Sequence, residues 1–271
     1  MIPIDYSELE ANILYEDDDL LAINKPAGWV VNRSHTYDGL TIQDFSAHRL
    51  GLTIQQTPTL TSTTEHPFGT PTEIFNERLG IVHRLDKETS GVLLLAKNEA
   101  TLIELLRQFK SREVHKTYVA LVHGKLSPTT GIIRLPMERS SNDFKKYTVS
   151  VDGKLGETRY SVVEFYPHLP EGISAKKGKS YQGFSLVELE PKTGRTHQIR
   201  VHMSAIKHPL VGDELYTGKK KYPIDVQWCP RQFLHAKQIQ FVHPTTKQTL
   251  TIQAPLPEDL ASVLEKLQPK T

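Results

Sequence analysis

The chain has 271 residues, 38% of them hydrophobic and 24% charged, which is ordinary for a globular protein able to bury a sizeable core. Its 33 basic and 31 acidic residues give a net charge of +2, so bulk charge alone does not indicate a nucleic-acid partner. Cys229 is the only cysteine, which excludes a disulfide framework and a cysteine-based zinc site. No apolar run approaches the roughly 18 residues of a membrane span, and the acidic N-terminus lacks a signal-peptide pattern, so we expect a cytoplasmic protein.

The first part of the chain predicts strands and short helices around a polar segment. Residues 13–25 have two apolar pieces around an Asp-rich turn, which predicts a β-hairpin. Residues 41–52 predict a short helix capped by Thr41. Residues 53–76 are rich in Thr, Ser and Pro, and we expect a long polar loop or insertion there.

A charged segment then lies between two apolar runs. Residues 81–82 and 92–96 predict buried strands, and the polar side chains between them include His83 and Asp86. After Asn98, which is expected to cap a helix, leucines recur at helical spacing. Polar groups at the ends of core strands are where a rigid scaffold presents chemistry.

The second half of the chain predicts mostly strands. We expect a strand at 114–125 and a looped region at 128–153 whose strand core is Ile132-Ile133. The remaining predicted elements are strands at 158–166 and 184–190 joined by a basic hairpin loop at 167–182, a helix from Thr196 to about 206, strands at 239–242 and 249–252, and a helix at 257–267. Because strands outnumber helices and often follow one another directly, we expect an α+β fold with a mixed, mainly antiparallel sheet, forming a single catalytic domain over 1–271.

Positive charge is clustered in three short lysine runs, at 145–146, 176–179 and 219–221. Such runs are common on solvated loop tips, so each one alone says little about a nucleic-acid partner.

Asp86 is the candidate catalytic residue. It stands close to Arg84 and Lys87 in sequence, and nearby positive charge keeps a carboxylate ionised, as a nucleophile or base requires. Taken alone, a structural ion pair or a turn-capping aspartate explains the same residue. A metal-assisted hydrolase using His83 and Asp86 is a second alternative, but no third ligand is near in sequence, and His197 and His202 are five residues apart, so we expect no metal.

Motifs along nearly the whole chain carry a more specific signal. They are NKPAG at 24–28, HRLDKETSG at 83–91, KTYVALVHG at 116–124, GRTHQIRVH at 194–202 with HPLVGD at 208–213, and LHA at 234–236 with FVHP at 241–244. In this order they resemble the motifs of the RluA-type pseudouridine synthase family. One departure is Lys207, which precedes HPL where the family usually has glycine.

The resemblance implies an enzyme that isomerises uridine in RNA to pseudouridine without a cofactor. By resemblance Asp86 is catalytic, Arg84 helps extrude the target nucleotide, Tyr118 stacks on the flipped base and Arg200 pairs with Asp86, while Ile199 belongs to the substrate-binding residues. The implied partner is a stem-loop of ribosomal or transfer RNA, and we expect a monomer. We also expect no N-terminal S4 domain, because only about a dozen residues precede the first predicted strand.

One alternative belongs to a different class of protein. The chain would be a catalytically inactive RNA-binding or RNA-chaperone module if its site had lost activity. The presence of Asp86, Tyr118 and Arg200 together argues against this alternative.

Overall fold

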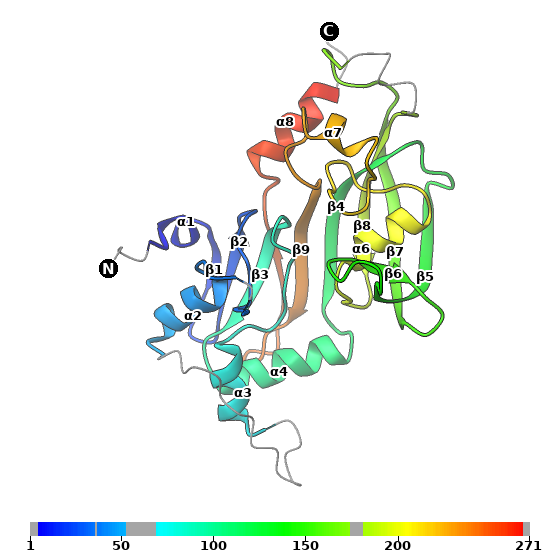
Figure 1. Cartoon of the computed structure of the whole chain (residues 1–271). Helices are drawn as coiled ribbons and strands as arrows, with labels where there is room; N and C mark the ends of the chain where they lie inside the picture. The colour runs from blue at the N-terminus through cyan, green and yellow to red at the C-terminus, as the bar shows by residue number, and fades with distance from the viewer. Residues whose placement is uncertain (1–4, 36, 53–68, 174–180, 268–271) are drawn as a thin grey trace. The chain divides into compact units, whose positions relative to one another are not determined.

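The computed structural model describes residues 5–35, 37–52, 69–173 and 181–267 (Figure 1). The chain forms two compact units. Unit 1 consists of Met1–His115 and Gln238–Ala254, and unit 2 of Lys116–Lys237 and Pro255–Thr271. The prediction of a single catalytic domain concerns both units together and stays a prediction.

Unit 1 is built on strands in the order β1-β2-β3-β9, with β10 paired to β9. The pairs β1–β2, β2–β3 and β9–β10 are antiparallel. Its elements are α1 (Ser7–Glu10), β1 (Ile13–Glu16), β2 (Leu20–Lys25), α2 (Ile42–Leu50), α3 (Pro71–Arg78), β3 (Ser90–Ala96), α4 (Glu99–Lys110), β10 (Thr249–Gln253) and the second half of β9 (Leu234–Val242). The predicted hairpin at 13–25 is confirmed as β1 and β2.

The core of unit 1 lies between its strands and helices α3 and α4, which contact each other (Figure 1). Leu102 and Leu105 of α4 pack with Val92 and Leu94 of β3 in one buried cluster. The helix begins as predicted, because the Asn98 side chain accepts the backbone N–H of Thr101. The cap of α2 by Thr41 is also confirmed.

Two predictions for unit 1 are wrong. Ile81 makes a single β-bridge to Leu95, and no strand forms at 81–82. The predicted loop at 53–76 is helical from Pro71, because Pro71 starts α3 and Thr70 forms a capping box with Glu73. Residues 53–68 of that prediction lie outside the described residues.

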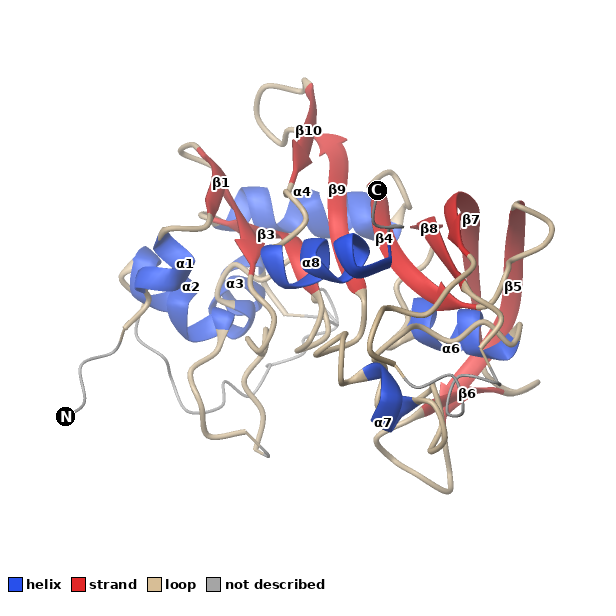
Figure 2. Ribbon diagram, turned by 90° about the horizontal axis from the view of Figure 1, so that it is seen from above, coloured by secondary structure: helices blue, strands red, loops and turns tan. Residues whose placement is uncertain are grey.

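Unit 2 has strands in the order β9-β4-β8-β7-β5-β6 (Figure 2). The pairs β4–β8, β8–β7, β7–β5 and β5–β6 are antiparallel. Its elements are β4 (His115–His123), β5 (Thr130–Arg139), β6 (Tyr147–Val149), β7 (Lys154–Tyr166), β8 (Phe184–Pro191), α6 (Gln198–Ala205), α7 (Tyr222–Asp225), the first half of β9 and α8 (Glu258–Leu267). The predicted α+β class with a mainly antiparallel sheet is confirmed.

Two buried clusters fill unit 2. Ile199 and Met203 of α6 pack on Ile133, Val187 and Leu189 of the strands. In the second cluster, α8 packs its Leu260, Val263 and Leu267 with residues that include Leu121 and Phe184. The apolar stripe predicted for the helix after 196 therefore faces the sheet.

The hairpin predicted around 167–182 is confirmed, since β7 pairs antiparallel with β8 up to Tyr166 and Phe184. Residues 174–180, which hold the second lysine run, lie outside the described residues. The strand core predicted at Ile132-Ile133 is confirmed within β5, but the predicted loop at 128–153 is wrong for half of its length. There β5 pairs with β7 from Thr130 to Met137 and with β6 from Met137 to Arg139. Ile132 is half exposed on β5, so its strand lacks the apolar pattern of a buried one.

No helix within the described ranges combines the length and the apolar character that crossing a membrane requires.

Candidate active site

The HRLD segment of unit 1 is an irregular backbone stretch held against β3. Leu85 is buried, Arg84 is exposed and Asp86 is partly buried. The backbone turns at Lys87 and Glu88, where the N–H of Thr89 donates to the carbonyl of Asp86 at 3.0 Å. Asp86 thus stands at the start of a hydrogen-bonded turn that leads into β3.

Lys25 stabilises this turn through a hydrogen bond to the Lys87 carbonyl. The side chain is fully buried at the end of β2, and its Nζ donates to the carbonyls of Pro26, Trp29 and Lys87 at 2.7, 3.0 and 3.0 Å. The N–H of Gly28 donates to the same Lys87 carbonyl at 2.9 Å. A buried ammonium is tolerated where acceptors surround it. Residue-by-residue reasoning gave Lys25 no role, although it lies within the NKPAG motif.

His83 has a structural partner in β3. Its Nε2 accepts the backbone N–H of Leu94 at 3.0 Å, and its ring stacks on Phe109 with centroids 5.0 Å apart. A nitrogen that accepts an N–H has its lone pair occupied, so this atom is not a metal ligand here. The geometry therefore weighs against the hydrolase that would use His83 with Asp86.

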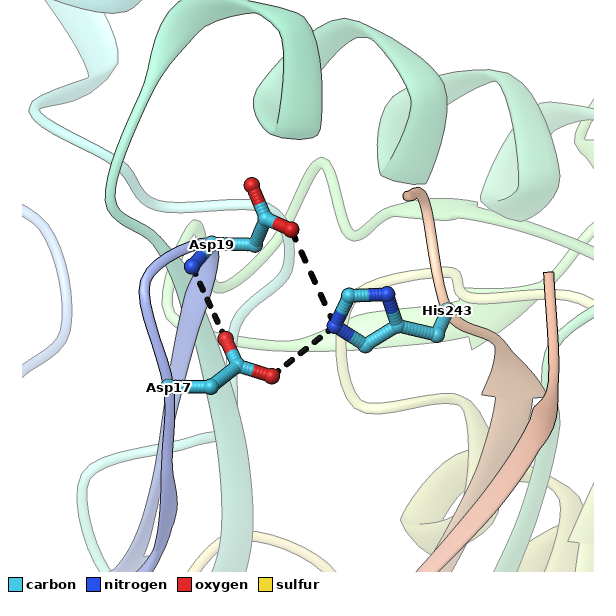
Figure 3. A group of neighbouring side chains, drawn as sticks. All are labelled: Asp17, Asp19 and His243. Atoms are coloured by element: carbon cyan, nitrogen blue, oxygen red, sulfur yellow. Dashed lines mark hydrogen bonds and ion pairs between the residues drawn. The ribbon is translucent and has the colours of Figure 1, made fainter. Parts of the chain in front are cut away.

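Among the described residues, the group of three side chains with metal-ligand spacing is Asp17, Asp19 and His243, also in unit 1 (Figure 3). His243 Nδ1 accepts the N–H groups of Thr245 and Thr246, both at 3.1 Å. A neutral imidazole then carries its proton on Nε2, which lies 2.9 Å from Asp17 Oδ2 and donates to it.

The same cluster joins three segments of unit 1. Asp19 Oδ1 accepts from the side chain of Asn98 at the start of α4, at 3.0 Å. Asp17 lies in the β1–β2 turn and His243 follows β9 (Figure 3). With the Nε2 proton directed at a carboxylate, the cluster is a structural connection and not a metal centre.

Tyr118 and Ile199 belong to the same apolar cluster of unit 2. Tyr118 lies on β4 opposite Leu189 and is partly buried, with its ring against that cluster. Ile199 is 5% exposed within it. Packing explains the position of Ile199, and its role toward a substrate stays a prediction.

Arg200 forms a two-point ion pair with Asp213 in unit 2. Nε donates to Oδ2 at 2.7 Å and Nη2 to Oδ1 at 2.9 Å, and both side chains are buried. The guanidinium carbon lies 5.1 Å from the centroid of the Tyr216 ring. A bidentate partner and an aromatic face together fix the plane of a guanidinium. Sequence reasoning missed Asp213, which closes the HPLVGD motif.

The start of α6 differs from the prediction. The helix begins at Gln198, and the preceding His197 has a left-handed φ of 57° without a side-chain cap, so Thr196 is not the cap. Gln198 organises the turn instead: its Oε1 accepts from Thr193 Oγ1 at 2.6 Å and from the N–H of Arg195 at 3.1 Å. His197 Nδ1 lies 3.0 Å from the Tyr216 hydroxyl.

The five predicted site residues are divided between the units. Arg84 and Asp86 lie in unit 1, and Tyr118, Ile199 and Arg200 lie in unit 2. The predicted pairing of Arg200 with Asp86 joins residues of different units and stays a prediction.

Comparison with known proteins assigns the chain to a family. The sequence model described as RNA pseudouridylate synthase matches residues 19–205, a span that contains all five predicted site residues. The chain belongs to the RNA pseudouridylate synthase family. The predicted family is therefore confirmed, and with it the prediction of an isomerase that converts uridine in RNA to pseudouridine.

Similar members of the RNA pseudouridylate synthase family cover nearly the whole chain. An RNA pseudouridine synthase of Bacillus subtilis, YlyB, is 36% identical over 96% of this chain and 74% of its own length. Ribosomal large subunit pseudouridine synthase D of Blochmanniella floridana is 34% identical over 95% of this chain and 73% of its own length. Both are described as synthases, and neither supports the alternative of an inactive RNA-binding module.

Solved structures of the family are also similar. Human RNA pseudouridylate synthase domain containing 4 matches with a TM-score of 0.65 and 25% identity, over 96% of this chain and 94% of its own. Human RNA pseudouridylate synthase domain containing 1 matches with a TM-score of 0.62 and 27% identity, over 95% of this chain and 87% of its own. The pseudouridine synthase fold is thereby confirmed.

Proposed function

We propose that this synthase modifies uridine in the RNA of the large ribosomal subunit, acting as a cytoplasmic monomer. Relatives from Blochmanniella floridana and Xanthomonas campestris, both named ribosomal large subunit pseudouridine synthase D, are each 34% identical to the chain over at least 95% of its length. This likeness favours ribosomal RNA over the transfer RNA that the motifs left equally open.

Asp86 is the proposed catalytic residue, and the structure of its turn is the observation that carries this assignment. The backbone on its C-terminal side is held by the Asp86–Thr89 turn and by the Lys87 carbonyl, which accepts from both Lys25 and Gly28. A reacting carboxylate must be held within a fraction of an ångström of its target, and a backbone fixed on this scale meets that need.

The roles of the other site residues follow from the chemistry of reaching a uridine. A base within folded RNA must be unstacked before a carboxylate reaches its sugar or ring, at a cost of about a few kcal/mol. Arg84, which is exposed, occupies the space that the extruded nucleotide leaves. Tyr118 stacks on the extruded base, which returns about 1–3 kcal/mol, and Ile199 supports that ring from the apolar cluster that both share.

Arg200 is the proposed partner of Asp86. An ionised carboxylate in a partly desolvated site protonates unless positive charge stands next to it. Asp213 already orients the guanidinium, so the nitrogen donors of Arg200 are presented in one plane.

The test maps pseudouridine in ribosomal RNA from cells that lack the gene and carry a plasmid copy. Wild-type protein restores modification at its target uridines, and Asp86→Asn restores none. Asp18→Asn is the matched control, since Asp18 is an exposed aspartate of unit 1 in the β1–β2 turn. Full activity of Asp86→Asn would remove Asp86 as catalytic residue, and pseudouridine lost only from transfer RNA would overturn the ribosomal substrate.

A further inference from the structure

The β5–β6 hairpin of unit 2 carries a solvent-exposed aromatic side chain, Phe144. Phe144, in the loop between β5 and β6 (green in Figure 1), is 72% exposed. Lys145 follows it and is exposed, and Lys146 and Tyr147 are partly buried. The run FKKY thus places two lysines between two aromatic side chains on a sheet-edge hairpin, and it contains one of the three lysine runs.

Hydrogen bonds order the loop that carries this ring. Ser140 donates its N–H to the carbonyl of Lys146 at 3.0 Å, and the N–H of Lys146 donates to the carbonyl of Asp143 at 2.8 Å. The Ser140 hydroxyl accepts the N–H groups of Asn142 and Asp143, both at 3.3 Å. The exposure of Phe144 is therefore built into a folded turn, and exposing a large apolar side chain in an ordered position costs stability.

The base of the hairpin is fastened to the neighbours of Arg200. The N–H of Tyr147 donates to the Tyr216 hydroxyl at 2.9 Å, and Tyr216 stacks under the Arg200 guanidinium. The Tyr147 ring meets the His197 ring edge to face at 5.8 Å. The hairpin is thus connected to a predicted site residue within the same unit through two contacts.

The charge of the hairpin loop is positive. Arg139 lies 5.7 Å from the Tyr147 ring centroid, and Lys145 is exposed beside Phe144. Asp143 is the acidic group of the loop: it pairs with Lys146 at 3.6 Å and accepts the N–H of Lys145 at 3.0 Å. Three basic groups therefore accompany one carboxylate around an exposed ring, which suits a ligand that has both phosphates and flat bases.

We propose that the β5–β6 hairpin is an RNA-binding arm, in which Phe144 stacks on an unpaired base next to the target site and Lys145 and Lys146 bind the flanking phosphates. The inference rests on the RNA substrate of the proposed function. It assigns a specificity role to residues that lie outside the motifs. Because a stacked ring needs an accessible base face, the arm selects loops and single strands over continuous duplex.

Binding of three synthetic RNAs to the full chain tests this proposal. The probes are a stem-loop with an unpaired uridine-containing loop, a single strand of the same loop sequence, and a blunt duplex of the same stem. Phe144→Ala is expected to weaken binding of the first two RNAs roughly ten-fold and to leave duplex binding unaffected, whereas Phe144→Trp retains the affinity. Val151→Ala, which trims a 92% exposed apolar side chain in the β6–β7 turn, is the matched control and leaves all three affinities unchanged.

The lysines are tested by the salt dependence of stem-loop binding. Lys145→Ala is expected to reduce the slope of log affinity against log salt by about 0.7 to 0.9, the value for one phosphate contact. Lys110→Ala at the exposed end of α4 removes the same charge elsewhere and keeps the slope.

The proposal is overturned if Phe144→Ala binds the stem-loop as wild type does, or if it weakens duplex and stem-loop binding equally. A Phe144 that instead captures a protein partner would produce the first of these results. Failure of the wild-type enzyme to modify ribosomal RNA would overturn the proposed function. The ratios of variant to wild-type affinity for the stem-loop and the duplex would still decide whether the β5–β6 hairpin binds RNA.

Discussion

Arg200 and Asp213 form a buried two-point ion pair within unit 2, with N···O distances of 2.7 and 2.9 Å. Asp213 Oδ1 also accepts the N–H groups of Leu215 and Tyr216, so the carboxylate is fixed by backbone as well as by the guanidinium. A guanidinium has five N–H donors, and the pair with Asp213 therefore does not exclude the proposed contact with Asp86. Asp213 is a positioning residue for Arg200.

Asp213→Asn is expected to destabilise unit 2 by about 3 kcal/mol, because removing one charge of a buried pair leaves the other uncompensated. Urea unfolding of both proteins measures the difference. Asp143→Asn is the matched control: Asp143 pairs with Lys146, but the two side chains are 41% and 38% exposed, so the expected cost is smaller, at most about 1 kcal/mol. Equal costs for the two variants would contradict the importance of burial at Asp213.

Arg200→Lys is expected to reduce the single-turnover rate of pseudouridine formation at least about ten-fold more than it weakens RNA binding. A lysine presents a point charge and does not reproduce two parallel hydrogen bonds in one plane. Single-turnover kinetics and equilibrium binding with the same RNA give the two numbers. Equal losses of rate and affinity would show that Arg200 serves binding alone.

Lys25→Met is expected to slow pseudouridine formation by more than about ten-fold and to cost about 2 kcal/mol of stability, since the Lys87 carbonyl beside Asp86 loses its charged donor. Lys97→Met is the control. Lys97 donates to Glu16 and to the Asp17 carbonyl at the β1–β2 turn, away from the HRLD segment in sequence. A wild-type rate in Lys25→Met would show that the hydrogen bond from Lys25 to the Lys87 carbonyl does not position Asp86.

Gly80→Ala is expected to destabilise unit 1 by more than about 3 kcal/mol. An alanine at this position would be strained in its backbone conformation, and its Cβ would also collide with a neighbouring backbone atom. Gly80 has φ +81°, and a Cβ there would meet the backbone oxygen of Ala96 far inside contact distance. Gly28 has φ +91° with open space around it, so Gly28→Ala isolates the strain alone, about 1–2 kcal/mol. Thermal unfolding of the two variants compares them, and similar shifts would contradict the predicted contact.

Asp17 is expected to make the free energy of unfolding depend on pH in the acidic range. Partial burial works to raise its pKa, but hydrogen bonds from Tyr15, from the backbone N–H groups of Leu20 and Asp19 and from His243 outweigh burial and lower the pKa to about 2. A carboxylate with a depressed folded-state pKa stabilises the protein fully above its unfolded value near pH 4, and this contribution is lost as pH falls toward 2.

Asp17→Asn should therefore be about 1–2 kcal/mol less stable than wild type at pH 7, with a difference that shrinks between pH 4 and 2. Urea unfolding at pH 7, 4 and 2.5 measures this difference. Asp18→Asn, which changes an exposed aspartate of the same turn, serves as the control. A difference that stays constant across this range would show that the Asp17 carboxylate is not stabilised by its partners.

Features encoded within a few residues were predictable from sequence. The Thr41 and Asn98 caps form because a side chain and an N–H three residues away suffice, and the hairpin at 13–25 forms because its turn and alternation are local. Asp86, Arg84, Tyr118 and Arg200 were found because each stands in a motif. At 81–82, local apolar character predicted a strand that the chain does not form, since strand pairing depends on neighbours elsewhere.

The sequence by itself therefore determined the family, the α+β class and the identity of the candidate catalytic aspartate. Only the tertiary structure decided that Lys25 holds the carbonyl of Lys87, 62 residues away, and that Tyr216 receives the N–H of Tyr147, 69 residues away. Such hydrogen bonds require two distant segments to meet at about 3 Å in one orientation. The arrangement of the strands brings these segments together, so the spacing of the residues along the chain does not predict the contacts.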